Sequence, residues 1–533
     1  MLICQLLLPF MRKILRRFFK FTTDLVSNRA FYIGAILGIF ITAFLINLRY
    51  VALHELPLSW DQASHVQESL SYLRYINQGD WESFFYSFHY YPPFLYHLFA
   101  LFFLVFKDVA LTSLFLNFGL IFLLMFTLLK VEPKKSSQYF TVLLITFFLT
   151  SSYLCGRLCD GYFGFNSWDF MLDVPTAILF FAFFLVFERF FKNPKRTVLI
   201  SFILSILFTL TLSSRVQSIT FLAIPVSLFI IYLISRLDFL SLLVFIPFPL
   251  VYLPWYSRNW TQIREYLELC ARFTDYNAKI SLSQTIFGLR SYFDLAISFL
   301  KVPGLIILAL SIFLLLLNKS RNQINLITNF LKKKESMLII VILVVNFIFY
   351  ASVPNIQLRA LLPGLLLFIY FVGRFIEAVF AKKEVLVFFV LIFVFTIYKL
   401  AFNFPSPYTV PTSYRFINNF QLENEFPQTS YFFDVDSPTF NVNNISVFYY
   451  ANGMEDRFSI SNNPNLYPEN KDQGTCYFYP NTRYLVHYSK MNEESQISFA
   501  KSCSSIVKVK NLKVVNEFVD KNLQEKVVVY EDK

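Results

Sequence analysis

Glycine is scarce in this chain, and its 13 residues include no phosphate-binding loop of the Walker or dinucleotide type. Cysteine is sparse as well. The six cysteines form no C-x-x-C pair, which argues against a zinc or iron-sulfur site. Charged residues make up only 15% of the sequence, against roughly 25% in a soluble globular protein. These shortages argue against a soluble, nucleotide-dependent enzyme.

Apolar side chains are abundant instead, at 56% of the chain with 68 phenylalanines. The net charge of +12 is not a sign of nucleic-acid binding, because the Lys and Arg residues fall mostly in short loops between apolar runs, where they orient a membrane protein. We therefore predict a multi-pass integral membrane protein with no nucleic-acid partner. Its Phe-rich, Gly-poor composition fits a bacterial plasma (inner) membrane.

Eleven apolar runs approach the roughly 20 residues that a membrane-spanning helix needs. A further run, Pro92 to Phe106, is short and opens with two prolines. If this run does not cross, all the basic loops fall on one side of the membrane, so we place it at the outer surface. The predicted spans lie near 31–49, 109–129, 138–154, 173–190, 197–214, 216–235, 239–256, 292–317, 337–353, 360–379 and 385–403.

This topology predicts a mainly α protein in three parts: a basic cytoplasmic N-terminus (1–29), a membrane helix bundle (30–404) and an extracytoplasmic domain (405–533). Its outer loops are 50–108, 155–172 and 257–291. In the last part, short β-like runs at 431–435, 484–488 and 527–530 predict a small α/β module. A disulfide between Cys476 and Cys503 is compatible only with an extracytoplasmic position.

The first outer loop contains an amphipathic stretch that predicts a helix lying on the membrane. Its apolar stripe runs from Ala63 to Leu73, and Asp61, His65 and Glu68 share the polar face. Asp61 is either a helix N-cap or a functional acid, and the two roles are compatible. The shared face leaves open a divalent metal on these three residues, although no cofactor is required. Residues 260–271 predict a second surface helix.

Five short motifs occur in order at predicted outer positions. They are Asp61 after the first span; Tyr91-Pro92-Pro93-Phe94-Leu95-Tyr96; Met171-Leu172-Asp173-Val174-Pro175; Pro254-Trp255-Tyr256-Ser257-Arg258-Asn259; and Leu358-Arg359-Ala360-Leu361-Leu362-Pro363. Together they resemble the motifs of the GT-C-type glycosyltransferases, the class that includes protein O-mannosyltransferases and the aminoarabinose transferases of bacterial lipid A. The sequence departs from that pattern at Tyr91, where a lysine is common, and after Asp61, where a second acid is usual.

The resemblance implies a transferase that moves a sugar from a polyprenyl-phosphate donor to a hydroxyl of a lipid, glycan or protein acceptor outside the cytoplasm. It makes Asp61 the general base and Asp173 the second carboxylate. Arginines at outer span ends would grip the donor phosphate, and a nearby histidine would replace the missing lysine. The candidates for phosphate binding are Arg258, Arg359, Arg215 and His89. Each arginine could instead snorkel or pair structurally, and each outer acid could simply be solvated.

Two other classes share this topology. A transporter or flippase of a lipid-linked or polar solute would keep the spans and the outer arginines, but it should carry more charges inside its spans. A non-catalytic protein of polysaccharide assembly would not need Asp61. The broad first loop, the surface helices and the soluble tail favour the transferase.

Overall fold

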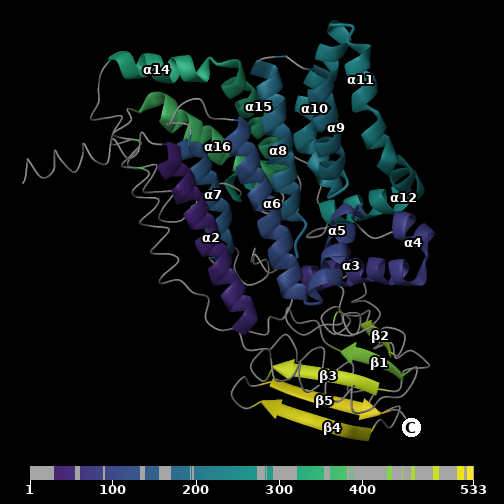
Figure 1. The fold of residues 1–533 in the computed structure, drawn as a ribbon. Helices are drawn as coiled ribbons and strands as arrows, with labels where there is room; N and C mark the ends of the chain where they lie inside the picture. The colour runs from purple at the N-terminus through teal and green to yellow at the C-terminus, as the bar shows by residue number, and fades with distance from the viewer. Residues whose placement is uncertain are drawn as a thin grey trace, which may run out of the picture.

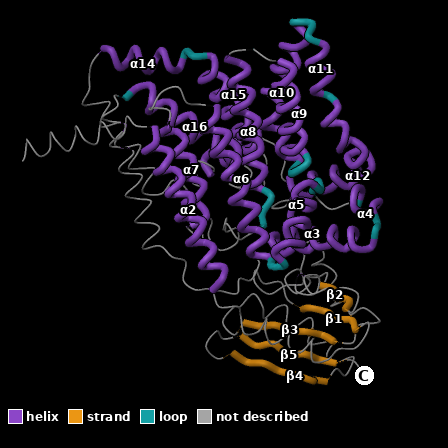
Figure 2. Tube along the Cα trace, viewed as in Figure 1, coloured by secondary structure: helices purple, strands orange, loops and turns teal. Residues whose placement is uncertain are grey.

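The computed structural model shows a bundle of helices with a β-sheet beyond one of its ends (Figures 1 and 2). It describes residues 29–53, 60–87, 91–131, 139–154, 170–192, 194, 197–272, 283, 285–291, 321–352, 361–380, 385, 388, 429–434, 447, 458–462, 484–490, 513–520 and 525–531. The helices are α2 (Arg29–Leu53), α3 (Trp60–Gln78), α4 (Trp81–Tyr86), α5 (Phe94–Phe106), α6 (Val109–Val131), α7 (Tyr139–Leu154), α8 (Asp173–Lys192), α9 (Thr197–Leu212), η2 (Val216–Ser218), α10 (Ile219–Ser235), α11 (Phe239–Phe245), α12 (Pro247–Arg272), α14 (Arg321–Leu331), α15 (Lys334–Ser352) and α16 (Leu362–Val379).

Within these ranges six helices are long and apolar enough to cross a membrane, or seven if α11 and α12, which meet at a 50° bend, count as one broken span. The six are α2, α6, α8, η2 with α10, α15 and α16. Helices α5, α7 and α9 are apolar but shorter. Every predicted span that falls on described residues is helical, although the span 239–256 is divided between α11 and α12, and the chain is an integral membrane protein. The runs 292–317 and 385–403 lie almost wholly outside the described residues, so a total of eleven stays a prediction.

Helix α8 is the centre of the bundle. It packs against α6, α9 and α16, and nearly all of its side chains are buried. A helix that is apolar on every face is stable when other helices surround it. The phenylalanines of α8 give it apolar surface on every side. Its polar residues are confined to its two ends, with Asp173 in the first turn and Glu188, Arg189 and Lys192 in the last.

Helices α7 and α16 approach each other closely at Gly373. A Cβ atom added there would lie 3.1 Å from the Cα of Thr141 and 2.8 Å from its Oγ1, so only glycine allows this separation. Nearby, a carboxylate oxygen of Glu377 accepts a hydrogen bond of 2.9 Å from the backbone N–H of Thr141. That N–H belongs to the first turn of α7 and has no partner within its own helix.

The first outer loop folds into α3, α4 and α5, and Gly79-Asp80 separates the first two of these. Gly79 has φ +69° and ends α3 through N–H bonds from Gly79 to the Ile76 carbonyl (3.1 Å) and from Asp80 to the Tyr75 carbonyl (2.9 Å). The Asp80 carboxylate then caps α4 by accepting from the N–H of Ser83 at 3.0 Å. A two-residue signal thus turns the chain sharply and starts the next helix.

Helix α5 begins directly after Pro92-Pro93 and has 13 residues, which gives a length of about 20 Å. This is shorter than the roughly 30 Å hydrocarbon core of a bilayer. One face of α5 packs against α3, and the backbone N–H of Phe94 bonds to the Ser213 carbonyl at 3.2 Å, next to the end of α9. These contacts fit the predicted juxtamembrane position of the segment.

The C-terminal sheet has the strand order β2-β1-β3-β5-β4. Strand β1 pairs in parallel with β2 and β3, whereas β5 pairs antiparallel with β3 and β4. All three predicted β-like runs are confirmed as strands. An α/β module as a whole stays a prediction. The strands are β1 (Thr429–Asp434), β2 (Phe458–Asn462), β3 (Tyr484–Lys490), β4 (Lys513–Asp520) and β5 (Glu525–Glu531).

The sheet lies beyond the end of the bundle at which α3 and α4 lie, and α14 lies at the opposite end (Figure 1). This is the arrangement expected if the first loop and the C-terminal domain share one side of the membrane and the basic loop that contains α14 faces the other. Which side is cytoplasmic stays a prediction.

Candidate functional site

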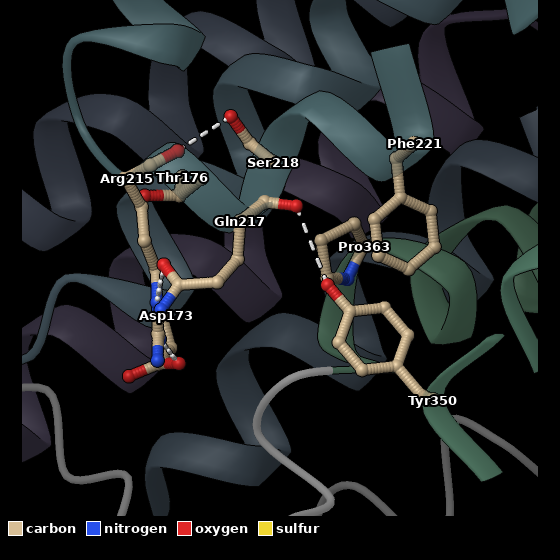
Figure 3. Close-up of a pocket in the computed structure, with 8 residues that line it drawn as sticks. All are labelled: Asp173, Thr176, Arg215, Gln217, Ser218, Phe221, Tyr350 and Pro363. Carbon is tan, nitrogen blue, oxygen red and sulfur yellow. Dashed lines mark hydrogen bonds and ion pairs between the residues drawn. The ribbon is translucent and has the colours of Figure 1, made fainter. Parts of the chain in front are cut away.

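A buried ion pair joins two of the predicted site residues, Asp173 and Arg215 (Figure 3). Asp173 is the first residue of α8, and Arg215 follows the end of α9, which packs beside it. Their side chains are only 2% and 12% exposed. The position of Asp173 at a helix N-terminus places its carboxylate at the positive end of the helix dipole, near the free N–H groups of the first turn. The predicted outer ends of two neighbouring helices thus present opposite charges to each other.

The Arg215 side chain is held on two further sides. Its Nε donates a hydrogen bond of 3.1 Å to the side-chain oxygen of Gln217. Its guanidinium carbon lies 5.5 Å from the centroid of the Tyr91 ring, within the range of a cation–π contact. The turn behind it is fixed by the hydroxyl of Ser218, which donates to the Arg215 carbonyl at 2.7 Å. Tyr91 stands where the resembled family commonly has lysine, and here its ring supports an arginine from elsewhere in the chain.

Helix α15 stabilises this turn through Tyr350. The Tyr350 hydroxyl donates to the Gln217 carbonyl at 3.3 Å and lies 3.1 Å from the hydroxyl of Thr220. The Tyr350 ring stacks on Phe221 with 5.8 Å between centroids. Tyr350 of α15 therefore holds the backbone of Gln217 in η2, and the side chain of Gln217 in turn holds Arg215.

These residues line a small pocket of about 20 Å³, which is room for about one water molecule. Its lining comes from the starts of α8, α10 and α16, from η2 and from the end of α15: Asp173, Thr176, Arg215, Gln217, Ser218, Phe221, Tyr350 and Pro363. Pro363 closes the predicted motif that begins at Arg359. Arg359 itself and His89 lie outside the described residues.

Helix α3 reaches the same region through His65. The Nδ1 of His65 lies 3.0 Å from the Tyr96 hydroxyl, and its ring packs edge-on against Tyr91 at 5.2 Å. Asp61 lies in the first turn of α3, four residues before His65 and therefore on the same helix face. The structure describes the backbone of Asp61 but not its side chain. Among the side chains that are described, no group of three His, Cys, Asp or Glu residues is placed to hold a metal.

His97 fixes α5 to α4. Its Nε2 donates to the Phe84 carbonyl at 2.9 Å, and its ring stacks on that of Phe84 with 4.1 Å between centroids. Burial lowers the pKa of His97 to about 4, although the bond to the carbonyl acts in the opposite direction. His97 is thus a neutral structural residue at physiological pH.

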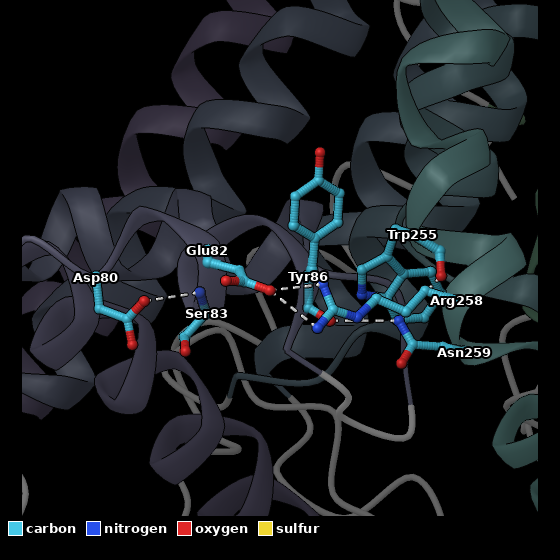
Figure 4. A network of polar contacts seen from close by, with 7 residues as sticks. All are labelled: Asp80, Glu82, Ser83, Tyr86, Trp255, Arg258 and Asn259. Carbon is cyan, nitrogen blue, oxygen red and sulfur yellow. Dashed lines mark hydrogen bonds and ion pairs between the residues drawn. The ribbon is translucent and has the colours of Figure 1, made fainter.

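Arg258 belongs to a different network, which joins α12 to α4 (Figure 4). Both terminal nitrogens of Arg258 lie 3.0 Å from one carboxylate oxygen of Glu82, and its guanidinium carbon is 5.6 Å from the Tyr86 ring centroid. In the same motif, Trp255 is buried and its Nε1 donates to the Ser87 carbonyl at 3.1 Å. The side chains of Arg258 and Glu82 are 56% and 71% exposed.

The structure therefore brings Asp173 and Arg215 together, beside Tyr91 and close to the helix that carries Asp61. Arg258 contacts Glu82 and is not among the residues that line the pocket. The sequence did not single out Gln217 and Tyr350. Gln217 is a polar residue two positions after Arg215, which is only a weak sign of a functional role. Tyr350 lies at the end of an apolar run, where the sequence gives no sign of one.

The fold defines a polytopic membrane helix bundle with a surface-helix loop and a C-terminal sheet on one end. A solved structure with this fold is that of ArnT from Cupriavidus metallidurans bound to undecaprenyl phosphate, with a TM-score of 0.53 and 10% sequence identity over 95% of this chain and 99% of that one. The apo state of the same protein gives a TM-score of 0.48 at 11% identity, over 94% and 98% of the two chains. No protein-family model and no curated protein matches the sequence. The predicted GT-C resemblance is confirmed at the level of the fold.

Proposed function

We propose that this protein is a glycosyltransferase that moves a sugar from a polyprenyl-phosphate donor to an acceptor hydroxyl on the extracytoplasmic side of the membrane. The observation that carries the proposal is the buried arginine, Arg215, which pairs with Asp173 beside the Tyr91 ring. The fold shared with ArnT, which is solved with undecaprenyl phosphate, supports a lipid phosphate as the ligand.

Arg215 is the residue that we assign to the donor phosphate. A guanidinium can place two parallel hydrogen bonds on phosphate oxygens, and it does so most strongly where water is excluded. Its contacts with Gln217 and Tyr91 fix the direction of the side chain before any ligand arrives. Asp173 balances the charge of Arg215, so we assign it the role of counter-ion, which the phosphate replaces at least in part on binding.

The reaction needs one base. The acceptor oxygen attacks the anomeric carbon of the sugar and the bond from that carbon to the phosphate oxygen breaks, so the prenyl phosphate leaves with the electron pair of that bond. The acceptor proton passes to a carboxylate, and Asp61 is the residue that we assign to this step. Asp61 lies in the first turn of α3, four residues before His65, whose ring packs against Tyr91, the ring that supports Arg215.

Arg258 and Arg359 remain candidates for additional phosphate contacts. Arg258 forms an exposed ion pair with Glu82, and exposed pairs of this kind contribute little to stability, typically about 0–1 kcal/mol. The pair can therefore open at small cost. Arg359 precedes the pocket residue Pro363 by four positions.

The test is a transfer assay with the full-length protein in vesicles that contain a radiolabelled polyprenyl-phosphate sugar. We expect Asp61→Asn to abolish movement of label from the prenyl lipid into product, because asparagine keeps a helix-start side chain of the same size but cannot accept the proton. Asp108→Asn is the matched control, since Asp108 also begins a helix, where it caps α6 by accepting from the Leu111 N–H at 2.7 Å. Full activity of Asp61→Asn would reject the base assignment.

The same vesicles separate the proposal from a transporter. A flippase or solute transporter would move its substrate across the membrane without breaking the bond between sugar and phosphate. Label that changes sides while staying on the prenyl lipid would therefore favour transport.

A further inference from the structure

Four large aromatic side chains are exposed on α4 and α12. On α4, Trp81 is 56% exposed, Phe85 53% and Tyr86 38%. On α12, Trp260 is 57% exposed. We call these four residues the α4–α12 aromatic surface. Two tryptophans with more than half their area uncovered are unusual, because tryptophan is highly buried on average.

The two helices that carry this surface are tied to each other. Arg258 of α12 binds Glu82, the neighbour of Trp81, and stacks on Tyr86 (Figure 4). The side-chain amide of Asn259 bonds to the Trp255 carbonyl at 2.9 Å and reaches the Tyr86 carbonyl at 3.5 Å. These contacts span the junction of α4 and α12, so the two helices that carry the aromatic residues are held together there.

The exposed apolar row of α12 leads directly to Trp260. Leu250 is 50% exposed and Leu253 is 54% exposed, and Trp260 is seven residues beyond Leu253. Seven residues are two turns, or about 10 Å, so Trp260 continues the same stripe. The next turn exposes the charged residues Arg264 and Glu265. In a membrane protein the leucine row faces hydrocarbon, so Trp260 stands where hydrocarbon gives way to the polar boundary.

Tryptophan and tyrosine favour this boundary because an amphipathic ring can lie among the lipid headgroups with its N–H or O–H hydrated. We propose that the α4–α12 aromatic surface lies in the phospholipid headgroup layer and sets the depth of the first outer loop at the membrane. The continuity with the lipid-facing row of α12 selects phospholipid over a soluble protein or a glycan as the occupant. The inference does not depend on the proposed transferase activity.

The test uses intrinsic tryptophan fluorescence of the full-length protein in phosphatidylcholine vesicles, with and without phosphatidylcholine that carries a spin label on its headgroup. The chain has five tryptophans. We expect Trp81→Phe with Trp260→Phe to remove about half or more of the emission that the headgroup label quenches, because both side chains lie at the label's depth. Trp255→Phe is the matched control: Trp255 is 2% exposed, so its loss should leave the lipid-quenched emission unchanged.

Each single variant, Trp81→Phe and Trp260→Phe, should lose part of the lipid-quenched emission while eluting as the same species as the wild type. The proposal is overturned if the double variant leaves lipid quenching unchanged. It is equally overturned if the lost emission is the part quenched by acrylamide from the aqueous phase, since the surface would then face water or a soluble partner.

Discussion

At the scale of single residues, the Asp173–Arg215 pair is the feature with the largest consequence. Each side chain is almost fully buried, so each charge depends on the other. Truncating one partner of such a pair typically costs about 2–5 kcal/mol, much of it because the remaining charge is left buried alone. An anionic ligand that binds Arg215 supplies a negative charge of its own, so the arginine is not left buried without a counter-charge. A phosphate group meets this requirement.

We predict that Arg215→Lys raises the KM for a polyprenyl-phosphate sugar about tenfold or more, because lysine keeps the charge but loses the planar fork and the bond from Nε to Gln217. Donor titration in the vesicle transfer assay measures this. Arg236→Lys is the control, since Arg236 also packs on an aromatic ring, that of Tyr232, but lies at the other end of α10. A KM unchanged in Arg215→Lys would remove Arg215 from the donor site.

His97 makes a prediction about pH. Its folded-state pKa of about 4 lies below the ordinary value of 6.5, so folding favours the neutral ring. This contribution to stability is complete above about pH 6.5 and is lost as the pH falls towards 4. We expect the thermal unfolding temperature of the wild type to fall over that window and the fall to be smaller in His97→Phe, which keeps the stack on Phe84 but cannot titrate.

Thermal scans in detergent between pH 4 and 7.5 measure the difference. At pH 7.5 His97→Phe should be the less stable protein by about 1 kcal/mol, because the Phe84 carbonyl loses its donor. Parallel pH profiles for the two proteins would contradict the assignment of His97 as a buried neutral residue.

At the scale of elements, helix packing depends on a few positions that the sequence does not mark. The buried carboxylate of Glu188 on α8 accepts from the Tyr370 hydroxyl of α16 at 2.5 Å and from Lys192 at 2.7 Å. The bond from Tyr370 fastens α8 to α16 near the end of the bundle away from the candidate site, and Lys192 pairs with Glu188 within α8. The close approach of α7 to α16 at Gly373 depends on the absence of a side chain.

Gly373→Ala is therefore expected to lower the free energy of unfolding by about 1–3 kcal/mol, because the added methyl group meets the backbone of Thr141 and the helices must move apart. Gly38→Ala on α2 is the matched control. A Cβ at Gly38 meets no atom within 4 Å, so this change should be neutral or stabilising by up to about 1 kcal/mol from helix propensity. Thermal unfolding in detergent compares the two, and equal effects would contradict the packing argument.

The helices themselves could be predicted well from the sequence, because an apolar run of sufficient length leaves few alternatives in a membrane. The boundaries between helices at the membrane surface could not be predicted from the sequence. The predicted span 239–256 and the predicted surface helix after it instead form α11 and a single long helix, α12, that carries Trp255, Arg258 and Trp260. The cause is local: the 50° bend lies between Phe245 and Pro249, at the start of α12, and not at the predicted end of the span near residue 256.

At the scale of the whole molecule, the sequence motifs do not predict which side chains pair. Asp173, Tyr91 and Pro363 come from three separate motifs and lie around one turn of the chain. Their partners Gln217 and Tyr350 are separated by 133 positions, and no periodicity reports a contact over that distance. The pairing of Arg258 with Glu82, 176 positions away, was missed for the same reason.

The candidate site, the surface helices and the C-terminal sheet all lie at one end of the helix bundle. Asp173 at the start of α8 and Arg215 just after the end of α9 lie at the same end of the bundle. Helix α3 packs on α5 nearby, and the C-terminal sheet lies beyond that end of the bundle (Figure 1). We place the proposed transfer reaction at this end of the bundle.

Mass spectrometry of the lipids that copurify with the affinity-tagged full-length protein tests the central claim most directly. We predict that a polyprenyl phosphate, or its sugar conjugate, is extracted from the wild type and from Arg236→Gln and is lost from Arg215→Gln, provided that all three elute as the same folded species. Absence of any prenyl phosphate from the wild type, or equal amounts in Arg215→Gln, would contradict it.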